Sequence, residues 1–140
     1  MDCENPDLPP ASFDLICGRA ILHHLDLDRS FSTIRRLLKP GGSALFLEPL
    51  GHNPAVNLFR RLTPSMRTVD EHPLLRADLA IARRYFSQVD VEPFALLTVF
   101  AAPLLKLPGF SPVFRAIEFA DRGLLRLPGV RWQGWTSIWS

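Results

Sequence analysis

The sequence has little cysteine, little net charge and no long hydrophobic run. Its two cysteines, Cys3 and Cys17, match neither the ligand spacing of a zinc site nor a disulfide framework. A net charge of +2 argues against a nucleic-acid-binding surface. The longest apolar stretch, residues 94–105, is interrupted by Thr98 and Pro103 and is shorter than the roughly 20 apolar residues of a membrane-spanning helix.

The composition is that of a globular domain, because 47% of the 140 residues are hydrophobic and 21% are charged. We therefore expect a single domain over residues 1–140. The amino terminus has no basic segment followed by an apolar one, so no secretory signal peptide is predicted. A reducing, cytoplasmic location is expected, with Cys17 as a small buried side chain in an apolar run.

Two short apolar runs, residues 13–18 and 43–48, predict parallel strands, and the first of them is expected to be buried on both faces. Asp26 or Asp28 is expected to cap a helix between them, and residues 40–42 (Pro-Gly-Gly) are expected to end it. The apolar stripe of this helix consists of Phe31, Ile34, Leu37 and Leu38. Strand, helix and strand together predict a right-handed crossover unit.

The second half of the chain predicts more helices and strands in alternation, which indicates an α/β fold with a mostly parallel sheet and an antiparallel final strand. The expected helices are 57–62, 73 or 74 to 86, 97–107 and 112–127, and the expected strands are 89–97 and a final one within 131–140. Ligands in such sheets bind beyond the carboxyl ends of the strands. The polar residues that follow those ends are His23, His24, Glu48, His52 and the run Asp70, Glu71 and His72.

Two interpretations of the 70–72 run remain open. His72 is a candidate general base for a hydroxyl or amine acceptor, because imidazole exchanges protons near neutral pH. The favoured alternative is that Asp70 or His72 begins the helix that follows, with Pro73 in its first turn. The histidines and carboxylates match no known metal-ligand spacing, so no metal is expected.

Four motifs appear in a fixed order and spacing: residues 2–4 (DCE), 9–16 (PPASFDLI), 22–25 (LHHL) and 37–43 (LLKPGGS). Together they resemble the later motifs of class I S-adenosylmethionine (SAM)-dependent methyltransferases of the small-molecule, type 11-like kind. The resemblance covers about residues 2–50 and fades over residues 51–140, where this family varies with its substrate. It implies a partial Rossmann-like sheet that consists of the later strands only.

The resemblance also implies which residues would contact SAM. Asp2 would bond the adenine amine, and the backbone of Cys3 would cap the ring. Gly18, Arg19 and His23 would lie beside the methionine part of the cofactor. The alternatives are that Asp2 is a disordered terminal residue, that Gly18 only allows close packing, and that one of His23 and His24 is an ordinary core or surface histidine. The candidate catalytic residues are His24 and His72.

The chain departs from the family pattern because no Gly-x-Gly occurs in it, and the acidic residue that grips the ribose is also missing. The resemblance therefore predicts a truncated methyltransferase that binds SAM poorly on its own. The alternatives are a non-catalytic remnant or interaction module and, less favoured, a peripheral membrane protein that uses residues 94–107. The expected acceptor is a small molecule, with residues 94–127 either roofing a hydrophobic pocket or simply covering the sheet. An open edge at 13–18 predicts dimerisation or a partner chain.

Overall fold

The protein, described here as a computed structural model over residues 3–66, 68 and 71–140, contains a four-stranded mixed sheet. The strand order is β1-β2-β4-β3, where β1 is Phe13–Arg19, β2 is Leu38–Pro49, β3 is Val91–Phe94 and β4 is Thr136–Trp139. Strands β1 and β2 pair in parallel, and β4 runs antiparallel to both β2 and β3. The predicted parallel unit and the antiparallel final strand are both confirmed.

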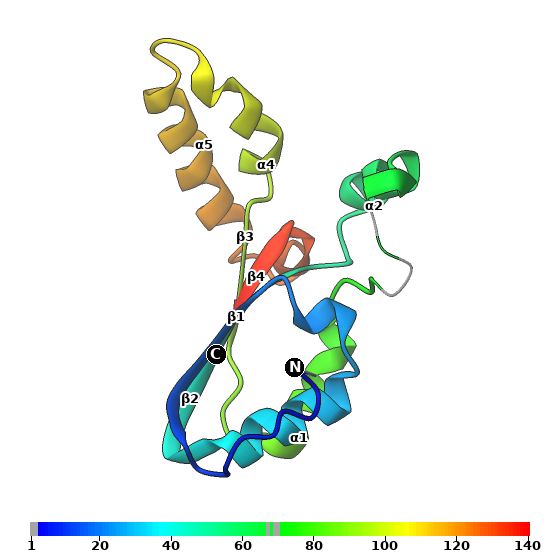
Figure 1. Cartoon of the computed structure of the whole chain (residues 1–140). Coiled ribbons are helices and arrows are strands. Elements are labelled where there is room, and N and C mark those ends of the chain that lie inside the picture. The colour runs from blue at the N-terminus through cyan, green and yellow to red at the C-terminus, as the bar shows by residue number, and fades with distance from the viewer. Residues whose placement is uncertain (1–2, 67, 69–70) are drawn as a thin grey trace.

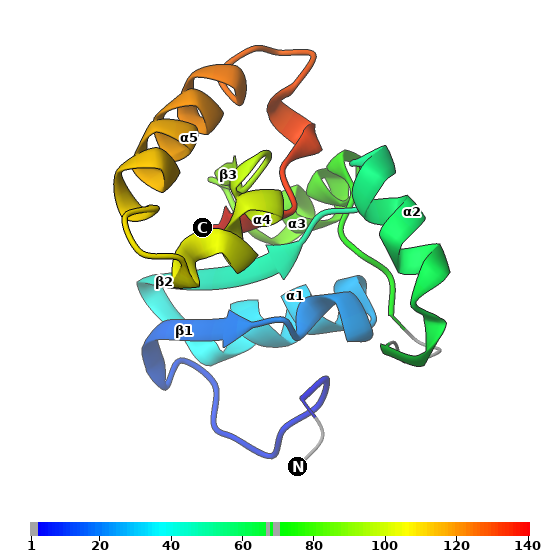
Figure 2. The ribbon, with the colours of Figure 1, turned by 90° about the horizontal axis from the view of Figure 1, so that it is seen from above.

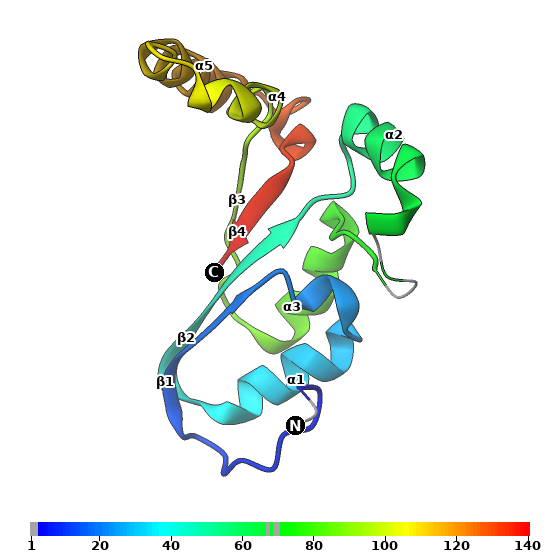
Figure 3. The same ribbon diagram turned by 45° about the horizontal axis from the view of Figure 1, so that its top comes forward.

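Helices α1 and α3 lie side by side over one face of the sheet, while α4 and α5 form a hairpin beyond the carboxyl ends of its parallel strands (Figure 1). The helix bounds are Leu27–Leu37 for α1, Pro54–Leu62 for α2, Leu79–Tyr85 for α3, Thr98–Ala101 for α4 and Ser111–Leu124 for α5. Helix α2 lies apart from the hairpin (Figures 2 and 3). As predicted, Asp26 caps α1: its Oδ1 accepts the Arg29 N–H at 3.0 Å.

The core lies between the sheet and the α1–α3 layer. Phe31 on α1 meets Phe86 edge-to-face, with ring centroids 6.0 Å apart. The buried cluster consists of Leu22, Leu27, Phe31, Ile34, Leu38, Phe46, Leu50, Leu74, Ala82, Val91 and Trp139. Each fully buried side chain of this kind stabilises the fold by roughly 1.5–3 kcal/mol. This cluster therefore fixes where the carboxyl ends of β1 and β2 lie.

The other face of β1 and β2 is bare, so the prediction that residues 13–18 are buried on both faces was wrong. Leu15 is 55% exposed and Leu45 is 42% exposed. Cys17, which pairs with Leu45 across the two strands, is also exposed, contrary to the expectation of a buried thiol. The reason is that α1 and α3 both lie on the same side. We call the surface formed by Leu15, Cys17 and Leu45 the bare face.

Several predicted boundaries also change. Residues 39–42 belong to β2 as an irregular segment, because the pairing jumps from Phe13↔Leu38 to Leu15↔Ser43. Gly41 takes a left-handed φ of 78° there, which glycine adopts without strain. The helix predicted from 73 or 74 begins only at Leu79, after a 3-10 turn at Arg76–Asp78. Leu74 is instead extended and forms a parallel bridge with Leu50.

Candidate functional site

The parallel strands end at the same edge of the sheet, and the polar residues of interest follow those ends. Directly after β1, Ala20 takes a left-handed φ of 52°, and its N–H donates to Leu47 O at 2.8 Å. Ala95, directly after β3, takes a φ of 59°. Such a backbone costs a non-glycine residue roughly 1–2 kcal/mol, so the surrounding contacts must hold both turns in place.

Glu48, near the end of β2, is the centre of this edge, and its side chain is fully buried. Its Oε1 accepts the N–H groups of Ile21 and Leu22, both at 3.0 Å. Its Oε2 accepts the His23 N–H at 3.4 Å and lies 2.7 Å from His23 Nδ1. One carboxylate thus organises the 3-10 turn Leu22–His24 that follows β1.

Three of the predicted histidines meet at this turn. His23 is only 5% exposed, and the centroid of its ring lies 4.0 Å from that of His24. His24 Nδ1 lies 3.2 Å from Thr68 Oγ1. The backbone N–H of His72 donates to His23 O at 2.8 Å, although the His72 side chain is exposed. The structure therefore brings together the segments that carry both candidate catalytic residues.

The predicted capping role of the 70–72 run is wrong for His72, and Asp70 lies outside the described residues. Helix α3 begins several residues later, at Leu79. The turn before it is closed by Asp78, whose Oδ2 accepts the Leu75 N–H at 2.7 Å. His72 instead belongs to the extended segment that leads to the bridge of Leu74 with β2.

The candidate cofactor residues at the start of the chain and in β1 have fewer contacts that define a role. Asp2 lies outside the described residues, and Cys3 is exposed. Arg19 is exposed at the end of β1. Gly18 packs closely, because a Cβ there would lie 2.4 Å from a carbon of the Phe46 ring. Close packing alone thus requires a glycine at this position.

His52, another residue singled out from the sequence, has a structural contact here. Its Nε2 accepts the Arg76 N–H at 2.8 Å, and its ring meets Trp132 edge-on at 5.9 Å between centroids. Over residues 3–66, 68 and 71–140, no group of three or more His, Cys, Asp or Glu side chains could hold a metal ion. In the same part of the chain, no helix combines the length and the apolar character needed to cross a membrane.

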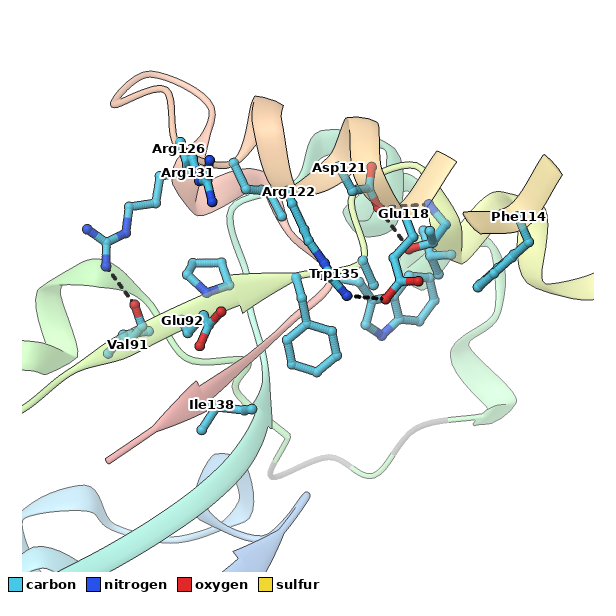
Figure 4. A pocket seen from close by; sticks show the side chains of 16 residues that line it. Val91, Glu92, Phe114, Glu118, Asp121, Arg122, Arg126, Arg131, Trp135 and Ile138 are labelled. Carbon is cyan, nitrogen blue, oxygen red and sulfur yellow. Dashed lines mark hydrogen bonds and ion pairs between the residues drawn. The ribbon is translucent and has the colours of Figure 1, made fainter. Parts of the chain in front are cut away.

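A cavity of about 1050 Å³ lies between α5 and strands β3 and β4 (Figure 4). Glu92 and Ile138 line it, and they alternate along their strands with Val91 and Trp139, which belong to the core. Val91 and Pro93 line it as well, so the whole of β3 borders the cavity. Its apolar walls include Phe94, Phe114, Val99, Leu125, Trp135 and Ile138.

Several charged side chains in this cavity form hydrogen bonds or ion pairs with other residues of the chain. Asp121 is buried and accepts the N–H groups of Leu96, Leu97 and Thr98 at 2.7–3.0 Å, which holds the start of α4 against α5. Arg122 pairs with Glu118 at 2.8 Å (Figure 4). With these groups paired, the cavity mainly offers an apolar surface to a ligand.

Known proteins match the chain in two different ways. Residues 1–46 match the model of a methyltransferase domain family. Over 48 residues, or 34% of the chain, it is 48% identical to a polyketide synthase-nonribosomal peptide synthetase of Aspergillus clavatus. The chain has the fold of a class I methyltransferase. This fold extends over nearly the whole chain, whereas the family model matches residues 1–46.

Two solved methyltransferases show the extent of the shared fold. A SAM-dependent methyltransferase from Archaeoglobus fulgidus superposes with a TM-score of 0.59 at 18% identity, over 94% of this chain and 60% of that one. The phosphoethanolamine N-methyltransferase 2 of Haemonchus contortus, solved with SAM, gives a TM-score of 0.57 at 19% identity, over 99% of this chain and 34% of that one. The chain thus spans less than two thirds of each of these proteins, and about 1% of the Aspergillus synthase.

Proposed function

We propose that this chain is part of a SAM-dependent methyltransferase that acts on a small hydrophobic molecule. The single observation that carries the proposal is the buried Glu48 and the three histidine segments gathered at the carboxyl edge of a methyltransferase-type sheet. Ligands of open α/β sheets bind at that edge. SAM-dependent methylation is the chemistry that the matched family and the shared fold support.

In this proposal SAM lies against the turn after β1. Asp2, Cys3, Gly18, Arg19 and His23 would contact it, as the family resemblance implies. His24 and His72 would face the acceptor, since their segments meet at His23. When bound, SAM supplies an electrophilic methyl group, and the chain's task is to hold the acceptor in line with it.

The acceptor class is proposed from the cavity under α5. Phe94, Phe114 and Trp135 give it an apolar lining, and it opens from the face of β3 and β4. A small hydrophobic or aromatic acceptor fits a pocket of this size and lining. A strongly charged acceptor would find mostly paired groups there.

We further propose that SAM binding by this chain alone is weak. The 140 residues contain no Gly-x-Gly. In the described part of the chain, β1 is at the edge of the sheet with one side unpaired, and the bare face lies beside it. A partner chain or a second copy that paired with this edge would complete the sheet. The same observations support the second candidate, a remnant or interaction module that has kept the sheet without catalysis.

Calorimetric titration tests these alternatives. SAM is titrated into this chain and into a longer version that also carries the residues encoded in frame upstream of Met1. Binding by the extended version alone supports the enzyme and the weak site. Binding by neither supports the non-catalytic candidate. Tight binding by the chain alone contradicts the proposed weakness.

A further inference from the structure

Glu48 is a fully buried carboxylate to which the proposed function gives no part in binding SAM or the acceptor. Its carboxylate has three backbone N–H groups around it, from Ile21, Leu22 and His23. Backbone N–H groups can only donate, so their convergence favours the ionised carboxylate as an acceptor. His23 Nδ1, at 2.7 Å from Oε2, must then carry a proton and donate it.

A neutral imidazole carries only one proton, so a proton on Nδ1 leaves Nε2 as a bare acceptor. Within the described part of the chain, no hydrogen bond to the Nε2 of His23 is present. The ring is packed against His24 and held at the carboxyl edge of the sheet. One nitrogen of His23 is therefore anchored by Glu48, and the other has no hydrogen-bond partner among the described residues.

We propose that Glu48 is a positioning residue that holds His23 in the Nδ1-protonated tautomer, so that Nε2 of His23, rather than His24 or His72, accepts the proton of a hydroxyl or amine acceptor. The acceptor part of this inference rests on the proposed function, whereas the tautomer does not. As the oxygen or nitrogen of the acceptor forms its bond to the methyl group, its bond to hydrogen breaks and the proton moves to Nε2. Bound SAM would supply the methyl group and the thioether leaving group, S-adenosylhomocysteine, and the Glu48 carboxylate would balance the charge of the His23 imidazolium.

A carboxylate that only closed the turn after β1 would give a different result on substitution. In Glu48→Gln, the amide oxygen can still accept the N–H groups of Ile21 and Leu22, but the amide NH₂ replaces Oε2 and cannot accept from Nδ1. The positioning role predicts that His23 changes tautomer. A purely structural role predicts lower stability with the tautomer unchanged.

The test is the two-bond ¹H–¹⁵N spectrum of the histidine side chains in the ¹⁵N-labelled chain at pH 8, where ordinary imidazoles are neutral. The His23 signals are assigned by their loss in His23→Gln. We expect the Nδ1-protonated pattern in the wild type, the opposite tautomer as the major form in Glu48→Gln, and no change at His23 in the control His24→Gln.

An Nε2-protonated or evenly mixed His23 in the wild type would overturn the proposal, and so would an unchanged tautomer in folded Glu48→Gln. If Glu48→Gln does not fold, the wild-type spectrum still shows whether His23 is protonated on Nδ1. In Glu48→Asp the shorter side chain moves the carboxylate away from His23, which should raise the share of the Nε2-protonated tautomer. These spectra need no SAM. A wrong prediction of the His23 tautomer can thus be told apart from a wrong prediction of SAM binding in the calorimetric titration.

Discussion

The two faces of the sheet are built from the same strands yet have different surroundings. On one face, Phe46 and Glu48 lie under the α1–α3 layer, and both are nearly or fully buried. On the other, Leu15 and Leu45 remain largely exposed. Parallel sheets are nearly always covered on both faces. The candidate site therefore depends on the covered face for its geometry, and the bare face is where this chain differs from a complete α/β layer.

The largest contrast is expected from one matched pair of leucines. Leu27 is 5% exposed in the core and Leu15 is 55% exposed on the bare face. Leu27→Ala should lower the free energy of unfolding by about 2–5 kcal/mol, because it leaves a cavity. Leu15→Ala should change it by about 0.5 kcal/mol or less. Urea unfolding followed by circular dichroism measures both, and equal losses would mean that the bare face is covered in solution.

The second contrast concerns two glycines. A Cβ at Gly18 would lie 2.4 Å from the Phe46 ring and 2.9 Å from Ile21 Cγ2. Gly18→Ala should therefore cost about 1–3 kcal/mol through overpacking. The control Gly123→Ala, on α5 with nothing within 4 Å of its Cβ position, should gain about 0.5–1 kcal/mol. Thermal melts of the two variants should move in opposite directions, and a neutral Gly18→Ala would argue against the close contact.

The bare face and the unpaired edge of β1 should also be visible in self-association. Because an exposed apolar edge strand pairs readily with another chain, we expect the molar mass from light scattering to rise with concentration. Leu15→Lys should reduce this rise, because a charge on an edge strand disfavours pairing. Leu62→Lys, on exposed α2, is the control and should leave it unchanged. A wild type that stays monomeric at all concentrations would count against the proposed pairing.

The smallest effect concerns the α1–α3 layer and its pH dependence. The Tyr85 hydroxyl donates to Asp28 Oδ1 at 2.7 Å, and this bond raises the pKa of Tyr85 above its usual 10.0. A raised pKa means that the folded state holds the proton more tightly, so the contribution is complete below about pH 10 and disappears as the pH rises through the folded value. Tyr85→Phe should lower the free energy of unfolding slightly at pH 7. At a pH above the folded-state pKa of Tyr85, the substitution should leave it unchanged. A difference that grows with pH would contradict the contact.

The parts of the fold that sequence predicts well are those with local signals. Asp26 before an apolar stripe gave the start of α1, whereas the Pro-Gly-Gly segment that was expected to end this helix lies inside β2. The predicted helix bounds were wrong where a contact with a distant residue sets the local structure. Leu74 is extended because it bridges Leu50, although its neighbours in the sequence suggest a helix. The prediction that Cys17 is buried was wrong for a related reason, since an apolar run does not reveal whether helices cover both faces of the strand.

For the candidate site, sequence placed the histidines near the strand ends but not their relations. Glu48 and His23 are 25 residues apart, and only the parallel register of β1 and β2 brings them to 2.7 Å. Sequence flagged Glu48 as a polar residue at a strand end but gave no partner for it. Asp121 gave no signal at all, because an acidic residue on a helix normally faces solvent, whereas here it holds the start of α4.

The central claim is that the turn after β1, supported by Glu48, is a SAM site that needs further chain to bind well. The most direct measurement is a titration of SAM into the ¹⁵N-histidine-labelled protein, with and without the upstream extension. We predict that the His23 and His24 signals shift in the extended protein and stay fixed in the chain alone. Calorimetric binding by the extended protein with both histidines unmoved would place SAM elsewhere and contradict the claim.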